Sequence, residues 1–89
     1  MRLDQFLRNT GLIVRRTVAK TACDESLVEL NGKPAKPAAE VRVGDRLTLK
    51  LGLRISEYEV LQVPLRPVPK ATREDYAKLL RTEKLEVEL

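Results

Sequence analysis

The beginning of the chain carries a helical pattern of apolar positions. Leu3, Phe6 and Leu7 follow the i, i+3, i+4 spacing, which places them on one face of a helix. We therefore expect a short amphipathic helix over residues 2–9. Gly11 follows soon after and is typical of a helix end.

A second helix is expected over residues 16–25. Its apolar stripe consists of Ala19, Ala22 and Cys23, and such small side chains let two helices approach closely. The apolar residues 12–14 lie between the two helices and are expected to pack inward. These features predict a helical hairpin in the first part of the chain.

The pattern then changes from helical spacing to alternation. Val28 and Leu30 flank a polar residue and are followed by Asn31-Gly32. Asn-Gly after an alternating segment is a strong β-hairpin signal, because both turn positions favour positive φ. Residues 33–37 are expected to return as a short edge interrupted by prolines.

Two further strands are expected after this hairpin. Leu47, Leu49 and Leu51 alternate with polar residues, and Gly52 ends that run. A second alternating run covers residues 56–63. The sequence therefore predicts an α+β fold, in which two N-terminal helices pack on a small, mostly antiparallel sheet.

The last part of the chain is expected to leave this domain. A proline-rich stretch predicts a stiff linker over residues 64–71, after a domain formed by residues 1–63. Thr72, with an aspartate three residues later, resembles a capping box, and an apolar stripe at helical spacing follows it. We therefore expect a short C-terminal helical extension over residues 72–89. Residues 83–89 leave two interpretations open, a frayed helix end or a disordered, acidic, strand-like tail.

Size and composition suit one soluble globular domain. The chain has 89 residues, of which 43% are hydrophobic and 34% are charged. No apolar run approaches the length of about 20 residues that a membrane helix needs, and no signal peptide is recognisable. The single cysteine, Cys23, cannot form an internal disulfide, which fits a reducing compartment. We expect a cytoplasmic protein that does not bind membranes.

The positive charge is concentrated at one end of the sequence. Residues 1–23 hold five basic residues and one acidic residue, whereas residues 24–89 hold twelve of each. The formal net charge of +4 therefore lies entirely in residues 1–23. A one-sided basic surface attracts polyanions. Charge alone leaves two interpretations open, a nucleic-acid surface or an ordinary solvated pair of helices.

Residues suited to catalysis or metal binding are scarce. The chain has no histidine, the commonest general base and metal ligand. Cys23 lies on an apolar helix stripe, and one thiolate cannot form a zinc cage. Neither of the common glycine-rich phosphate-binding motifs is present. We therefore expect a binding protein rather than an enzyme, with no metal and no cofactor.

Four segments together resemble the S4-type RNA-binding domain. They are RLDQFL at residues 2–7, RRTVAKTAC at residues 15–23, VELNGKPAKPA at residues 28–38 and VRVGDRL at residues 41–47. The resemblance covers residues 1–63 and implies an S4-like fold, the αL motif, that binds RNA. Aromatic residues make up only 3% of the chain, so we expect structured RNA rather than single strands stacked on aromatic side chains.

Within S4 proteins, the sequence looks closest to the bacterial RqcP family and its relative, the heat-shock S4 protein. The RLDQFL start and the run RRTVAKTACD carry this resemblance. It implies binding of rRNA and tRNA on the large (50S) ribosomal subunit, in ribosome-associated quality control of stalled nascent chains. It also implies an RqcH-like tailing factor as a partner. We expect a monomer away from the ribosome.

The basic residues of the matched segments are the candidate RNA contacts. Arg15 and Arg16 stand at the start of the predicted second helix, where free backbone N–H groups also favour phosphate. Asp4 matches an acidic position of the family and is expected to orient Arg8 or a neighbouring arginine. The expected RNA-binding residues are Arg2, Arg8, Arg15, Arg16, Lys20, Lys33 and Lys36. For the two hairpin lysines, a solvated turn is an equal alternative.

One position departs from the S4 pattern, and two other functions stay open. The family usually has a glycine and then a basic residue where this chain has Ser26-Leu27. Ser26 lacks the conformational freedom of glycine at a helix end, and Leu27 removes one phosphate contact. The alternatives are an RNA-binding accessory module that acts in trans with an RNA-modifying enzyme, and a protein adaptor that uses residues 64–69 and the terminal segment.

Overall fold

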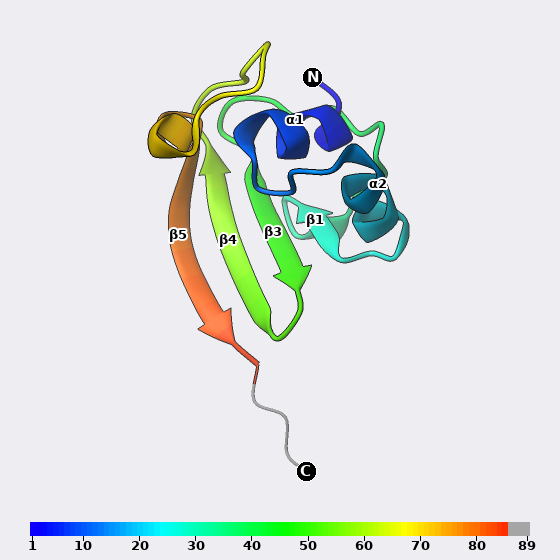
Figure 1. Cartoon of the computed structure of the whole chain (residues 1–89). Coiled ribbons are helices and arrows are strands. Elements are labelled where there is room, and N and C mark those ends of the chain that lie inside the picture. Colours follow the sequence, from blue (N-terminus) through cyan, green and yellow to red (C-terminus); the bar gives the residue numbers. More distant parts are fainter. Residues whose placement is uncertain (86–89) are drawn as a thin grey trace.

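The computed structural model describes residues 1–85 of the chain. Two helices precede an antiparallel sheet, and both lie over the same side of that sheet (Figure 1). The ribbon of β3, β4 and β5 extends beyond the helices (Figure 1). No helix in the described part of the chain is long and apolar enough to cross a membrane.

The predicted helical hairpin is confirmed. Helix α1 spans Leu3–Thr10 and helix α2 spans Arg16–Asp24. Gly11 ends α1 in the left-handed conformation, with φ 76°, and its N–H donates to the carbonyl of Arg8. Between the helices Ile13 is buried, whereas Val14 is 75% exposed. The expectation that this loop packs inward is therefore wrong for Val14.

The end of α2 is a Schellman motif built on a serine. The N–H of Ser26 donates to the carbonyl of Cys23 (3.1 Å), and the N–H of Leu27 donates to the carbonyl of Ala22 (2.9 Å). Ser26 has φ 62°, the left-handed conformation that glycine adopts at much lower cost. The departure from the S4 pattern therefore keeps the geometry of the glycine position and adds backbone strain.

The sheet has five antiparallel strands in the order β2-β1-β3-β4-β5. The strands are β1 (Val28–Leu30), β2 (Lys33–Pro34), β3 (Arg46–Leu51), β4 (Arg54–Val60) and β5 (Ala77–Lys84). The predicted Asn31-Gly32 hairpin joins β1 to β2, and its two turn residues have φ 53° and 83°. Strand β4 begins and ends earlier than the predicted run over residues 56–63.

The predicted C-terminal helical extension is wrong. A short 3-10 helix, η1, covers Lys70–Asp75, and the next residues form strand β5 along the free edge of β4. The Thr72 hydroxyl donates to the carbonyl of Pro69 (3.1 Å) instead of forming a capping box. Strand pairing outweighs the helical spacing, because it satisfies the backbone groups of β4. Residues 86–89 of the predicted extension lie outside the described residues.

The helices and the inner face of the sheet enclose one core. The buried apolar side chains from these elements are Leu3, Phe6, Leu7, Ala19, Ala22, Cys23, Val28, Leu47, Leu49, Val60 and Ala77. Because side chains alternate along strands, the pairing places the intervening charged residues on the outer face. That face carries as many basic as acidic side chains: Arg46, Lys50, Lys78 and Arg81 against Glu29, Glu57, Glu59 and Glu83.

The segment between β4 and β5 is held against the end of α1 by hydrogen bonds. The Asn9 side chain donates to the carbonyl of Pro64 (3.0 Å) and the N–H of Val68 donates to the carbonyl of Asn9 (2.9 Å). Arg73 of η1 donates to the carbonyls of Thr10 (2.8 Å) and Gly11 (3.1 Å). The predicted linker therefore packs against the helical hairpin. A domain boundary at residue 63 stays a prediction.

Candidate nucleic-acid interface

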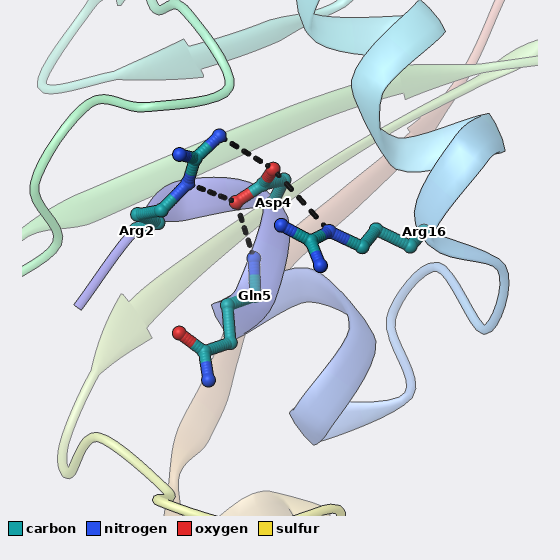
Figure 2. A network of polar contacts seen from close by, with 4 residues as sticks. All are labelled: Arg2, Asp4, Gln5 and Arg16. Atoms are coloured by element: carbon teal, nitrogen blue, oxygen red, sulfur yellow. Dashed lines mark hydrogen bonds and ion pairs between the residues drawn. The ribbon is translucent and has the colours of Figure 1, made fainter.

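Two arginines, one just before α1 and one at the start of α2, converge on one buried carboxylate (Figure 2). Arg2 donates from Nε to Oδ1 of Asp4 (3.1 Å) and from Nη2 to Oδ2 (3.1 Å). Arg16 lies on the other side, with Nε 3.8 Å from Oδ2. The N–H of Gln5 also donates to Oδ1 (2.8 Å). We call Arg2, Asp4 and Arg16 the arginine pair site.

The members of this site differ sharply in exposure. The Asp4 side chain is 2% exposed, whereas those of Arg2 and Arg16 are 52% and 59% exposed. Burial favours the neutral carboxyl, but the hydrogen bonds and charge of Arg2, the Gln5 N–H and the charge of Arg16 together hold the pKa of Asp4 below its usual range. The carboxylate is therefore ionised at neutral pH, while the guanidinium groups keep donors that face solvent.

The crossing of the two helices creates this site. Asp4 follows the first residue of α1, and Arg16 is the first residue of α2. Small buried side chains on α2, Ala19 and Cys23, let the helices approach so that Arg16 meets Asp4. The structure pairs Asp4 with Arg2 and Arg16, and within residues 1–85 it gives no Asp4–Arg8 ion pair. Asp4 thus contacts two neighbouring arginines rather than Arg8.

The other predicted RNA contacts are exposed but do not touch Asp4. Arg8, Arg15 and Lys20 lie on or beside the two helices. Lys33 lies in β2, and Lys36 lies in the loop that follows. That loop approaches α1, because the N–H of Asp4 donates to the carbonyl of Pro37 (3.0 Å). These positions permit contact with a polyanion, and the RNA-binding role of each stays a prediction.

Cys23 has the surroundings of a packing residue. It is 3% exposed within the core. Burial, with the nearby charges of Asp4 and Asp24, raises the pKa of its thiol to about 11, so the reactive thiolate is scarce at neutral pH. In the part of the chain that the structure describes, no group of three or more His, Cys, Asp or Glu side chains could hold a metal ion.

Sequence reasoning missed two residues that the structure brings into this region. Arg73 contacts the end of α1 from a segment that is distant in sequence, so no local pattern could reveal it. Glu40 forms an isolated β-bridge with Arg2, and in sequence it lies in the gap between the VELNGKPAKPA and VRVGDRL segments.

Comparison with known proteins identifies the family. A family model described as the S4 domain matches residues 1–47. A protein of Helicobacter pylori (strain J99), named RQC P-site tRNA stabilizing factor, is 45% identical over 71 residues, which are 79% of this chain and 84% of that protein. The chain is an S4-domain member of the RQC P-site tRNA stabilizing factor family. This confirms the resemblance to S4 and RqcP proteins.

Other relatives agree with this assignment. The RQC P-site tRNA stabilizing factor of Bacillus subtilis (strain 168) is 42% identical over 60 residues, 67% of this chain and 70% of that protein. The solution structure of hypothetical protein HP1423 has a TM-score of 0.78 and 39% identity, over 93% of this chain and 100% of that chain. The trimeric structure of Vibrio cholerae Heat Shock Protein 15 has a TM-score of 0.83 over 89% of this chain and 80% of that chain. At 22% identity it shows the shared fold alone.

Proposed function

We propose that this protein binds structured rRNA and tRNA on the large ribosomal subunit, in ribosome-associated quality control of stalled nascent chains. The observation that carries the proposal is the arginine pair site, in which a buried carboxylate holds two half-exposed guanidinium groups. The relatives at 42–45% identity, named for stabilising a P-site tRNA, support the same function. The role is stabilisation by binding, without a catalytic step.

The chemistry of the site suits phosphate recognition. A guanidinium presents several N–H donors in a fixed plane and can bind a phosphate through two of them. Asp4 accepts hydrogen bonds from two Arg2 donors and meets Arg16 only as a 3.8 Å ion pair, so the other donors of both guanidinium groups are free to contact phosphate oxygens. Asp4 fixes the orientation of both groups before RNA binds, which lowers the entropy lost on binding.

The remaining basic residues extend this surface in our proposal. Arg8, Arg15 and Lys20 add contacts from the helices, and Lys33 and Lys36 add contacts from the hairpin side. The protein works in the cytoplasm as a monomer away from the ribosome. On the subunit it supports an RqcH-like tailing factor.

Crosslinking in cells tests the proposal with a matched pair of variants. Wild type is expected to crosslink to large-subunit rRNA and tRNA, and Arg16→Glu is expected to lose that footprint. Arg66→Glu is the control, because Arg66 is exposed and has no ion pair within residues 1–85. An unchanged footprint for Arg16→Glu would contradict the role of Arg16 in RNA binding. Capture of an RNA-modifying enzyme without ribosomal particles would contradict the ribosomal function.

Salt dependence provides a second test in vitro. If four or five phosphates are contacted, the slope of log K against log salt is about −3 to −4.5 by the duplex rule. A slope near zero for a structured RNA would rule out the arginine surface.

A further inference from the structure

A pocket lies directly beside the arginine pair site. It has a volume of about 390 Å³ and is lined by Met1, Arg2, Gln5, Ala38 and Glu40. Pockets that hold small ligands begin at about 300 Å³. Arg2 lines the pocket and is also part of the arginine pair site. A nucleotide whose phosphate binds at the arginine pair site could therefore place its base in the pocket.

Backbone hydrogen bonds fix the two walls of the pocket relative to each other. The N–H of Leu3 donates to the carbonyl of Ala39 (2.8 Å), and the N–H of Val41 donates to the carbonyl of Met1 (2.8 Å). Arg2 and Glu40 form the β-bridge between these bonds. The backbone of both walls is therefore held in place, which reduces the ordering that a ligand would have to impose on the main chain.

Two polar side chains of the pocket have hydrogen-bonding capacity to spare. Gln5 is exposed and points away from Asp4, on the side of Arg2 (Figure 2). Within residues 1–85 the structure gives its amide group no hydrogen bond. Among the residues that the structure describes, the Glu40 carboxylate has one long contact, with Nη2 of Arg42 at 3.5 Å, and it is 62% exposed.

The carboxylate decides which kind of group the pocket accepts. Phosphate would be repelled by Glu40, although it is attracted to Arg2 nearby. A group with N–H donors would pair with the carboxylate instead. An unpaired nucleobase combines such donors with a flat face that can stack on a guanidinium plane.

We propose that this pocket binds one unpaired guanine of the RNA, with Glu40 and Gln5 reading its edge and Arg2 stacking on or flanking its ring. The proposal rests on the proposed RNA-binding function and specifies what the surface recognises. Guanine presents two adjacent donors, N1–H and the N2 amino group, which match the two oxygens of a carboxylate. Adenine, cytosine and uracil offer no such adjacent pair. The Gln5 amide supplies a donor and an acceptor for the remaining edge.

The test uses RNA hairpins that differ at a single loop nucleotide. The loop carries guanine, inosine or adenine among uridines, and inosine lacks only the N2 amino group. Wild type is expected to bind the guanine hairpin about tenfold more tightly than the adenine hairpin, with inosine between them. Glu40→Gln and Gln5→Ala are expected to remove this preference and to leave the salt dependence unchanged.

The controls separate the pocket from the basic surface. Glu74→Gln removes an exposed carboxylate from η1 and is expected to keep the guanine preference. If wild type binds all three hairpins equally and with a steep salt dependence, the proposal that the pocket binds guanine is overturned and the proposed function stays intact. If none of the hairpins shows salt-dependent binding even at low salt, the proposed function fails and the pocket fails with it.

Discussion

At the scale of single residues, Asp4 places a negative charge beneath a surface that we expect to meet phosphates. Counting charges alone predicts that its removal strengthens RNA binding. The geometry predicts the opposite, because Arg2 and Arg16 would lose the carboxylate that orients them. The sign of the effect therefore distinguishes a general basic patch from an organised site.

We expect Asp4→Asn to bind a structured RNA about three- to tenfold less tightly than wild type, or roughly 1 kcal/mol. Fluorescence anisotropy at fixed salt measures this change. Asp24→Asn is the matched control, because Asp24 is exposed at the end of α2 and its loss changes the net charge equally. Binding by Asp4→Asn as tight as that of Asp24→Asn would show that orientation is unimportant.

The same carboxylate predicts a pH dependence of stability. The pKa of Asp4 is lowered in the folded protein, so the ionised form stabilises the fold at neutral pH. This stabilisation is present above the unfolded pKa of about 3.9 and is lost as the pH falls through the lower folded value. Urea unfolding from pH 7 down to pH 2 should therefore show a loss of stability in acid that is smaller in Asp4→Asn. Parallel curves for the two proteins would contradict this assignment.

The sequence predicts which residues form the arginine pair site better than it predicts which arginine contacts Asp4. The basic positions could be predicted from the sequence, and the resemblance to S4 proteins predicts that Asp4 meets an arginine. The spacing rule for a single helix favours Arg8 as its partner, because that rule considers only neighbours on one element. Arg16 reaches Asp4 through the crossing of two helices, which depends on the packing of Ala19 and Cys23.

At the scale of elements, the end of α2 stores strain that one substitution can remove. Ser26 holds φ 62°, which costs a residue with a Cβ roughly 1 kcal/mol. We expect Ser26→Gly to raise the free energy of unfolding by about 0.5–1 kcal/mol. For a domain of this size, 1 kcal/mol corresponds to about 4–8 °C in Tm.

Thermal unfolding of three proteins checks this prediction. Ser26→Ala keeps the Cβ and is expected to stay close to wild type, which separates the backbone effect from loss of the hydroxyl. A lower Tm for Ser26→Gly than for Ser26→Ala would mean that the left-handed conformation carries little strain here.

Element type could be predicted where one local signal dominated. The Asn31-Gly32 turn and the apolar stripes of the helices needed no tertiary information. Strand β5 could not be predicted in this way, because its residues also fit a helical stripe. A shift in register between Glu57 and Tyr58 of β4 lets β5 stay paired despite that spacing. The choice of strand over helix depends on the open edge of β4, which lies too far away in the sequence for a local pattern to include it.

At the scale of the whole molecule, Arg73 connects the C-terminal part of the chain to the helical hairpin. Its two hydrogen bonds reach carbonyls at the end of α1, and bonds from a charged donor contribute about 1.5–3 kcal/mol each. We expect Arg73→Ala to lower the free energy of unfolding by about 1–3 kcal/mol, less than the sum for two such bonds, because both bonds are only partly buried and water can replace the lost donors. Urea unfolding measures the loss.

The site of that loss can be located by hydrogen exchange. Arg73→Ala should weaken the protection of β5 and of the last turn of α1 together, whereas Arg66→Ala should leave both unchanged. Arg73→Lys keeps the charge without the planar fork and is expected to recover only part of the stability. Loss of protection in β5 alone would show that Arg73 does not couple the two regions.

The balanced outer face of the sheet has a kinetic consequence. Because that face is neutral as a whole and residues 1–23, which include almost all of both helices, hold the net charge, the molecule is an electric dipole. A dipole rotates in the field of a polyanion before the two surfaces touch. The protein would therefore meet RNA with its helices foremost, and a larger fraction of collisions would be productive than for the same charge spread evenly.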